Sequence, residues 1–427
     1  MRVAFAGMSH LGIVSALGLA SKGVDVVCID HDQKLVDKLQ NGQFPIIEDD
    51  LKLLFNQARD RLRFSTDWNL LSTCDLAYIS QDIPTDDLGR SDTTSIDYYI
   101  KNVVESLNSK SGVVILSQVV PGFTRKVKTS LSHYLAYQVE TLVFGKAVER
   151  ILFPERYIVG LIDGDSEILP AHEKVLSLFE CPIFKMSYES AELAKISINL
   201  FLASSVLAAN SLAQIAEKIG ACWSDIESSL KLDKRIGSNA YTSPGLGISG
   251  GNIERDIRSA EILASSNNCD LSLYHAIELN SSLRKRWPVD ILLSLMPNLP
   301  PRPTVAIWGL TYKSKTHSIK NSPALQNIKN LLDVCNLQIS DPLVKIPADL
   351  SSKVMFNYDP LEVLRGADVL IIFNDSIEFC QVSIDDIRKL MNDRIIIDPC
   401  RVLSNKVDLD FDYFSLGSKP KLRYKGA

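Results

Sequence analysis

The chain has 427 residues, enough for two to four domains at about 100–200 residues each. Hydrophobic residues make up 46% and charged residues 23%, as in globular proteins, and the net charge of −5 offers nothing to attract nucleic acid or a membrane surface. None of the eight cysteines forms a Cys-x-x-Cys pair, so we expect no metal site and a reducing, cytoplasmic environment. Apolar runs stay below about 18 residues, so we expect neither a signal peptide nor a membrane span.

Strands alternate with helices in the first part of the chain. RVAFA at 2–6 is predicted to be a buried strand, followed by a turn at 7–12 and a helix over 11–23. The further elements predicted here are a helix at 31–42 and strands at 24–30, 76–80, 113–118 and 141–145. This alternation favours a parallel sheet that is covered on both faces.

The pattern of apolar and polar residues changes at Glu189. A single long helix is predicted from there as far as Gly220, and more helical patterns follow it. The proline-rich segment 297–303 is typical of a linker, and strands and helices alternate again beyond it. The predicted fold class is therefore α/β in three parts. These are an N-terminal Rossmann domain (1–188), a central helical domain with a long helix (189–296) and a C-terminal Rossmann-like α/β domain (297–427).

The turn after the first strand has the pattern of a dinucleotide site. Gly7 permits a tight turn, Gly12 permits close packing of helix on strand, and the helix N-terminus faces a pyrophosphate. Asp30 ends the next strand and is placed to accept from a ribose 2′-hydroxyl, which favours NAD over NADP. The cofactor-binding residues predicted in this region are Gly7, Ser9, His10, Leu11, Gly12 and Asp30. Ser9 is unusual, because a second glycine normally stands there.

Several motifs then occur in the order that one family shows. They are Ile83-Pro-Thr85, Ser117–Thr124, Phe153–Arg156, Glu192–Asn199, Arg235–Gly237, Trp308–Lys313, Ser322-Pro323 and Asp341-Pro342. On these motifs the sequence resembles the UDP-glucose/GDP-mannose dehydrogenases over nearly its whole length. The resemblance implies a homodimer built on the long helix, NAD in the N-terminal domain, and a nucleotide-diphosphate sugar, with UDP favoured, held by the C-terminal domain. It also implies oxidation of a sugar CH₂OH to carboxylate in two hydride transfers, through a cysteine thioester.

Residue roles follow from the resemblance. The implied catalytic residues are Thr124, Glu155, Lys195, Asn199, Asn252 and Asp256. Pro84, Thr85 and Thr124 join the cofactor site. The implied substrate-binding residues are Glu155, Arg156, Lys195, Asn199, Arg235, Tyr241, Gly250, Lys313 and Lys320.

Some of these residues have a plainer interpretation. Lys195 and Asn199 share one helix face, where a lysine can stabilise an oxyanion or extend to solvent. Glu155 can position water or form a surface ion pair with Arg156. Thr124 can bond the same water or cap the helix after it.

The stretch GLGISGGNIERD at 245–256 departs from the family pattern. With Asp256 aligned, Asn252 falls on the nucleophilic cysteine, and neither Cys222 nor Cys269 is placed to replace it. An amide can hydrogen-bond a hydroxyl or an aldehyde oxygen but cannot form a thioester. Three hypotheses follow: a dehydrogenase that makes one hydride transfer or oxidises an aldehyde hydrate, a redox-neutral epimerase, or a non-catalytic nucleotide-sugar-binding homologue.

Overall fold

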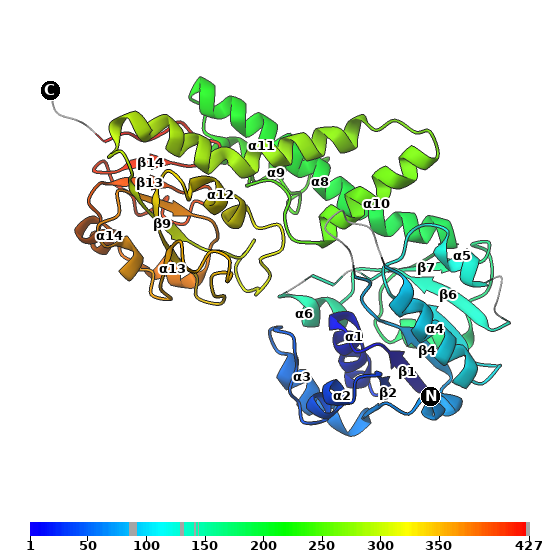
Figure 1. Ribbon diagram of the computed structural model, residues 1–427. Helices are drawn as coiled ribbons and strands as arrows, with labels where there is room; N and C mark the ends of the chain where they lie inside the picture. The colour runs from blue at the N-terminus through cyan, green and yellow to red at the C-terminus, as the bar shows by residue number, and fades with distance from the viewer. Residues whose placement is uncertain (85–91, 129–131, 141, 144, 424–427) are drawn as a thin grey trace. The chain divides into compact units, whose positions relative to one another are not determined.

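The computed structural model describes residues 1–84, 92–128, 132–140, 142–143 and 145–423 (Figure 1). The chain forms two compact units, residues 1–198 and 199–427.

The first unit is built on an eight-stranded sheet with the order β3-β2-β1-β4-β5-β6-β7-β8. Its strands are β1 (Arg2–Ala6), β2 (Asp25–Ile29), β3 (Leu62–Ser65), β4 (Leu76–Ile79), β5 (Gly112–Ile115), β6 (Tyr134–Gln138), β7 (Tyr157–Leu161) and β8 (Ile183–Ser187). Among these described strands, neighbours run parallel except β6 and β7, which are antiparallel. The part from β3 to β6 has the strand order of a dinucleotide-binding fold.

Helices cover both faces of this sheet. They are α1 (His10–Ser21), α2 (Gln33–Gln40), α3 (Leu51–Ala58), α4 (Thr94–Ser106), α5 (Phe123–Lys128), α6 (Ala147–Leu152), α7 (Pro170–Ser177), the start of α8 (Tyr188–Ile219), and the 3₁₀ turns η1 (Arg59–Arg61) and η2 (Trp68–Thr73). Val3 and Phe5 point into one apolar cluster with α1, while Ala4 and Ala6 point into another with α4. The strand is thus apolar at every position from Val3 to Ala6 because both of its faces are buried.

The second unit has a six-stranded, fully parallel sheet with the order β11-β10-β9-β12-β13-β14. Its strands are β9 (Thr304–Trp308), β10 (Asn336–Ser340), β11 (Met355–Phe356), β12 (Val369–Ile372), β13 (Ile395–Ile397) and β14 (Asp412–Phe414). Its helices are the remainder of α8, α9 (Trp223–Leu232), α10 (Asn252–Ser266), α11 (Ser272–Leu295), η3 (Met296–Asn298), α12 (Pro323–Leu331), η4 (Glu362–Leu364), α13 (Ile377–Gln381) and α14 (Ile384–Leu390).

The predicted α/β class with a long central helix is confirmed. Val289 and Leu292 of α11 share an apolar cluster with β9, β10 and β12, so the central helices pack with the C-terminal sheet in the second unit. The boundaries at 188/189 and 296/297 stay a prediction.

One predicted strand is wrong. At the described positions 142, 143 and 145 the chain forms loop and turn, and the strand in this region is β6, at Tyr134–Gln138. The physical reason is local, because Gly145 has a left-handed φ of 84° and the Leu142 amide donates to the Glu140 side chain instead of to a neighbouring strand.

The expectation that no stretch could span a membrane also needs correction. Among the described helices, α8 is long and apolar enough by length and composition alone, with a mean hydropathy of 1.6 over its best window. Such helices also occur in the cores of globular proteins, and α8 carries the fully buried Glu192. Leu212, Ile215 and Ile219 form an exposed apolar strip at helical spacing along it.

Candidate functional site

The turn after β1 has the geometry of a dinucleotide site. Gly7 has a φ of 99°, and a Cβ there would lie 2.7 Å from the backbone nitrogen of Gln81. A Cβ on Gly12 would lie 2.0 Å from the Gly7 carbonyl oxygen, so only glycine fits where α1 crosses the turn. The first intrahelical bond of α1 joins the Ile13 amide to the Ser9 carbonyl at 2.9 Å, which leaves the earlier amides at the helix N-terminus directed toward an anion site.

Asp30 stabilises this turn. Its carboxylate is buried and accepts from the Met8 amide at 2.7 Å and from the Asp32 amide at 3.0 Å. A carboxylate has about four acceptor positions, so the ribose hydroxyls of NAD can also be accommodated. Ser9 is tolerated in place of a glycine because its hydroxyl donates to the Ser80 carbonyl at 2.7 Å. The residues present therefore fit the dinucleotide.

The structure brings the predicted cofactor residues Gly7, Ser9, His10, Leu11, Gly12 and Asp30 together in this one turn. Pro84 is exposed beyond the end of β4, and Thr85 lies outside the described residues.

The loop between β5 and α5 is fixed by a carboxylate on the long helix. Glu192 is buried and accepts from the Gly122 amide at 2.6 Å and from the Thr124 amide at 2.8 Å. Burial raises the pKa of Glu192, and the bonds from Thr124 and Gly122 oppose that effect. Thr124 therefore lies in the first turn of α5 with its amide capped by the Glu192 side chain of α8. Sequence reasoning quoted Glu192 in a motif but gave it no role.

Lys195 lies one helical turn beyond Glu192 and is half-buried. Its charge affects the pKa of Glu140, a residue that follows β6 at the carboxyl edge of the sheet. Burial raises the pKa of Glu140, and the negative charge of Asp82 raises it further. The positive charge of Lys195 lowers this pKa, but the pKa remains above its usual value. The charges of His10 and Arg150 also favour the ionised form of Glu140. A carboxyl group of raised pKa that senses the charge of a lysine, on the sheet edge that carries the dinucleotide turn, can take part in proton transfer.

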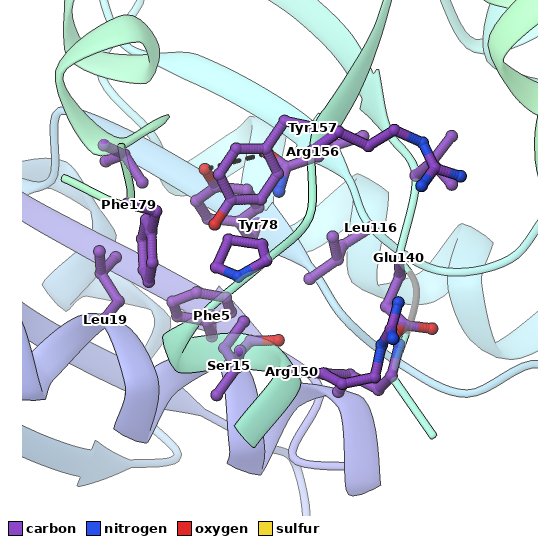
Figure 2. A pocket seen from close by; sticks show the side chains of 16 residues that line it. Phe5, Ser15, Leu19, Tyr78, Leu116, Glu140, Arg150, Arg156, Tyr157 and Phe179 are labelled. Atoms are coloured by element: carbon purple, nitrogen blue, oxygen red, sulfur yellow. Dashed lines mark hydrogen bonds between the residues drawn. The ribbon is translucent and has the colours of Figure 1, made fainter. Parts of the chain in front are cut away.

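Sequence reasoning missed Glu140, although a carboxylate two residues after a buried strand is a usable signal. Glu155, which it chose instead, has 63% of its side chain exposed and pairs with Arg150 at 3.2 Å and Arg156 at 3.4 Å. These contacts match the surface ion pair that was the alternative for Glu155. Figure 2 shows Glu140, Arg150 and Arg156 among the residues around a cavity of about 50 Å³, which has room for water but not for a sugar.

In the second unit, a hydrogen-bonded group surrounds Asp256. The Asn199 amide donates to its buried carboxylate at 2.5 Å, and Arg255 Nε lies 3.3 Å from the other carboxylate oxygen. Asn252 is the first residue of α10 and is exposed, one helical turn before Asp256. The structure thus brings Asn199, Arg255 and Asp256 together and leaves Asn252 open to solvent.

The glycines before α10 pack against a loop of the C-terminal sheet. Gly250 has a φ of 101°, and a Cβ there would lie 2.9 Å from the Tyr312 ring. A Cβ on Gly251 would lie 3.7 Å from the Lys320 side chain, and Lys313 Nζ lies 5.8 Å from the Tyr312 ring centroid. Gly250, Lys313 and Lys320 therefore meet in one place, where two cations can face a diphosphate.

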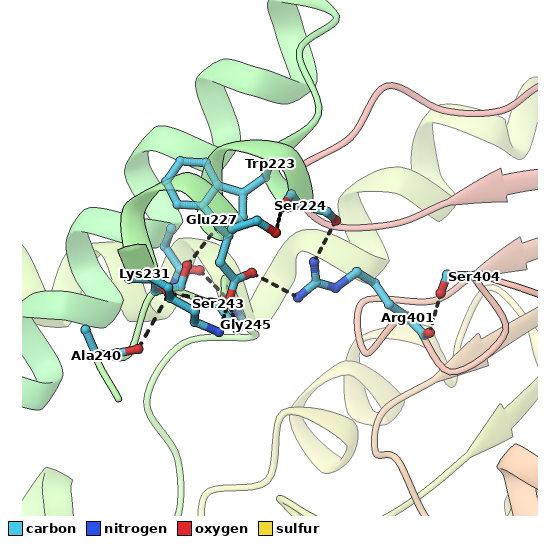
Figure 3. Close-up of polar contacts among 12 residues, drawn as sticks. Trp223, Ser224, Glu227, Lys231, Ala240, Ser243, Gly245, Arg401 and Ser404 are labelled. Carbon is cyan, nitrogen blue, oxygen red and sulfur yellow. Dashed lines mark hydrogen bonds and ion pairs between the residues drawn. The ribbon is translucent and has the colours of Figure 1, made fainter. Parts of the chain in front are cut away.

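Arg235 and Tyr241 do not join this group within the described chain. The Arg235 guanidinium is exposed and binds Asp233 at 2.6 Å, and Tyr241 is 47% exposed. Buried Glu227 stabilises the segment that carries them by accepting from Ser243 at 2.5 Å and pairing with Lys231 at 2.8 Å (Figure 3).

Glu227 was also missed from the sequence. Burial acts to raise the pKa of Glu227, but its bonds from Lys231 and Ser243 lower that pKa overall. Arg401 adds a longer contact to the same carboxylate at 3.8 Å. Glu227 therefore stays ionised and joins α9 to the segment ahead of the glycine-rich loop.

Known proteins share this organisation. Residues 1–180 match the NAD binding domain of the UDP-glucose/GDP-mannose dehydrogenase family, residues 189–282 match its central domain, and residues 306–405 match its UDP binding domain. The UDP-glucose 6-dehydrogenase of Rickettsia conorii is 29% identical over 434 residues, which cover 98% of this chain and 100% of that protein.

Solved structures show the same fold. A UDP-glucose dehydrogenase from Pyrobaculum islandicum has a TM-score of 0.85 at 23% identity, with 98% of each chain covered. A UDP-D-ManNAc dehydrogenase from Pyrococcus horikoshii has a TM-score of 0.84 at 23% identity, with 98% of this chain and 99% of the other covered. Three domain models of one family match in order over most of the sequence, and the first of them coincides with a turn built for a dinucleotide. The chain therefore belongs to the UDP-glucose/GDP-mannose dehydrogenase family, and its N-terminal part is an NAD-binding domain.

Proposed function

We propose that the protein is an NAD-dependent dehydrogenase that oxidises the CH–OH group of a UDP-sugar. The observation that carries this proposal is the dinucleotide turn of Gly7, Gly12 and Asp30, in a chain that also matches a UDP binding domain. NAD bound at that turn supplies the hydride acceptor.

The chain's own residues then handle the proton and the oxygen. Glu140, with its raised pKa, takes up the proton of the sugar hydroxyl directly or through water. The Lys195 ammonium stabilises the negative charge that develops on the same oxygen. Glu192, one helical turn before Lys195 on α8, holds the loop up to Thr124 in place. Glu155 has no part in this scheme, because its carboxylate is occupied by two arginines at the surface.

At the nucleotide end, Lys313 and Lys320 act as point charges for the diphosphate beside Gly250. The match of residues 306–405 to a UDP binding domain supports a UDP-sugar in particular.

Asn252 limits the reaction. It stands at the start of α10, aligned with the nucleophilic cysteine of the family, and an amide cannot form a thioester. We therefore expect one hydride transfer per sugar and release of an aldehyde. An amide can still hydrogen-bond a hydroxyl or an aldehyde oxygen.

The apolar strip of Leu212, Ile215 and Ile219 on α8 supports a homodimer, because exposed apolar strips of this kind are usually covered by a partner. Sedimentation equilibrium of the wild type and of an Ile215→Glu variant tests this part of the proposal. A wild type that remains monomeric at micromolar concentration overturns it.

The decisive test of the activity is a panel of UDP- and GDP-sugars incubated with NAD, with NADH counted per sugar consumed and the product identified by mass spectrometry. One NADH and an aldehyde are expected. Two NADH and an acid would show oxidation of the aldehyde hydrate, and no net NADH with an altered sugar would show an epimerase. Saturable binding without turnover would refute every enzymatic alternative. An Asn252→Cys variant tests whether the second oxidation can be restored.

A further inference from the structure

A buried carboxylate outside every motif joins two functional segments of the first unit. Glu48 lies in the loop before α3, and its side chain is 0% exposed. Its Oε1 accepts from His10 Nε2 at 2.8 Å and from the Gly145 amide at 2.9 Å, and its Oε2 accepts from the Ala147 amide at 2.9 Å. A carboxylate removed from water is stable only with such compensation, so these donors are tightly coupled to it.

The two ends of this link lie in different parts of the proposed site. His10 is the first residue of α1, in the dinucleotide turn, and 12% of its side chain is exposed. Gly145 lies two residues before α6 and Ala147 is the first residue of that helix, which follows Glu140 in the chain. The helices α1 and α6 are themselves in contact, since a Cβ on Gly18 would lie 2.6 Å from Ile151 (Figure 1).

We propose that Glu48 is a positioning residue that couples the dinucleotide turn to the start of α6, so that NAD bound at the turn stabilises residues 145–153 through His10 and Glu48. The coupling rests on the proposed dehydrogenase function. It follows from the shared Oε1 atom, because His10 and the Gly145 amide donate to the same oxygen and a displacement of one alters the position of the other.

Two variants separate the parts of this link. Glu48→Gln keeps the side-chain volume but replaces one carboxylate oxygen by an NH₂ group. This NH₂ group then faces an N–H donor and cannot accept from it, so at least one of the three bonds is lost. His10→Phe removes the bond from the dinucleotide turn, together with the electrostatic effect of His10 on Glu140, and leaves the carboxylate bonded to the Gly145 and Ala147 amides. His10→Gln restores an N–H donor and is the conservative rescue. Glu149→Gln, on the exposed side of α6, is the matched control.

Hydrogen exchange of the full chain, with and without saturating NADH, tests the proposal. In the wild type and in Glu149→Gln, NADH slows exchange both in residues 7–13 and in residues 145–153. In the Glu48→Gln and His10→Phe variants, NADH slows exchange only in residues 7–13. In a fluorescence titration of these variants, the Kd for NADH rises about tenfold, which corresponds to about 1.4 kcal/mol of binding free energy. His10→Gln regains most of the protection of residues 145–153.

The outcomes are distinguishable. If residues 145–153 are protected by NADH in both variants as in the wild type, Glu48 is merely structural and the coupling is refuted. If Glu48→Gln does not fold, as thermal unfolding would reveal, His10→Phe carries the test alone, because it keeps the buried carboxylate and its α6 bonds. If the wild type does not bind NADH at all, the proposed dehydrogenase fails, and the coupling fails with it.

Discussion

The two sheets of the protein repeat one design at the turn after their central strand. Strands β3-β2-β1-β4-β5-β6 have the same order as β11-β10-β9-β12-β13-β14. The Gly7 amide donates to the Ile29 carbonyl at 2.9 Å, and the Gly309 amide donates to the Ser340 carbonyl at 2.8 Å. Both glycines have a left-handed φ, 99° and 93°.

An aspartate supports each turn in the same way. Asp30 accepts from the Met8 amide at 2.7 Å, and Asp341 accepts from the Leu310 amide at 2.7 Å. Both carboxylates are buried at the end of the neighbouring strand.

The two turns differ in the chain beyond the glycine. Helix α1 begins at His10, directly after the first turn, whereas α12 does not begin until Pro323 and the loop before it carries Lys313 and Lys320. In the proposed function, the first site would bind phosphate with backbone amides and a helix dipole, and the second with the side chains of Lys313 and Lys320. The same strand plan therefore serves two kinds of phosphate recognition.

Gly12→Ala is expected to have the largest effect. The new Cβ would lie 2.0 Å from the Gly7 carbonyl oxygen, so α1 must shift and NADH binding should weaken by about 100-fold or more, at least about 3 kcal/mol. A fluorescence titration with NADH measures this, and UDP binding to the second unit is the internal control. An NADH affinity within about twofold of the wild type would show that the turn is not the dinucleotide site.

Glu140→Gln separates chemistry from binding. Removal of the proposed base should lower kcat about 10²-fold or more while the KM for the UDP-sugar changes little. Steady-state kinetics checks this, with Glu155→Gln as the matched control that keeps near-normal kcat. The assignment of the two glutamates is reversed if Glu155→Gln is the damaged variant.

The paired aspartates offer a direct comparison of the two turns. Asp30→Ala should weaken NADH binding about 10- to 100-fold, because a charge-assisted contact to the ribose is lost, and should leave UDP binding unchanged. Asp341→Ala should do the opposite. Calorimetric titration of both ligands against both variants is the measurement, and loss of both affinities in either variant would mean that the turns do not act independently.

The lysines of the second turn should have a moderate effect. Lys313→Gln and Lys320→Gln are each expected to raise the KM for the UDP-sugar about 3- to 10-fold, because both lysines are only half-buried and the contribution of such charges is reduced by solvent. Added salt should weaken UDP binding more than NADH binding. Lys315→Gln, at an exposed neighbouring position, is the control. Equal salt sensitivity of the two ligands would contradict the contrast between amide and cation recognition.

The pH dependence of the first unit concerns its stability and not its activity. Burial lowers the pKa of His172 from 6.5 to about 3, and its ring nitrogens lie 3.1 Å from Tyr134 Oη and 3.0 Å from Gln138 Oε1. Below about pH 6.5 the unfolded chain binds a proton that the native imidazole excludes, so the free energy of unfolding falls as pH drops toward about 3.

Between about pH 6.5 and about pH 5 this loss is about 2 kcal/mol. Urea unfolding at several pH values should show it, and His172→Gln should flatten the curve over this window. The histidines of the second unit, His275 and His317, are exposed, so that unit provides the comparison. An unchanged slope in His172→Gln would assign the loss to other groups.

Sequence predicted the parts of this protein that depend on local signals. The glycines, the strand before them and Asp30 lie close together in the chain, so the dinucleotide turn could be identified residue by residue. The long helix could be predicted in the same way, because its sequence keeps a helical pattern without a break.

The missed residues depend on contacts between distant segments. Glu48 contacts Gly145, and the charge of Lys195 acts on the pKa of Glu140, only after the sheet has formed. The false strand has a different, local origin, because at the described residues 142, 143 and 145 the Leu142 amide donates to the Glu140 side chain and Gly145 has a left-handed φ.

The antiparallel pair of β6 with β7 determines the direction from which the long helix approaches the cofactor edge. Because β7 and β8 run against the other strands, β8 ends at the amino edge of the sheet, and α8 starts there at Tyr188. The helix rises about 1.5 Å per residue, so Lys195 arrives about 10 Å farther on, toward the carboxyl edge where Glu140 lies. After a parallel strand, the same helix would have begun at the carboxyl edge and carried its lysine away from it.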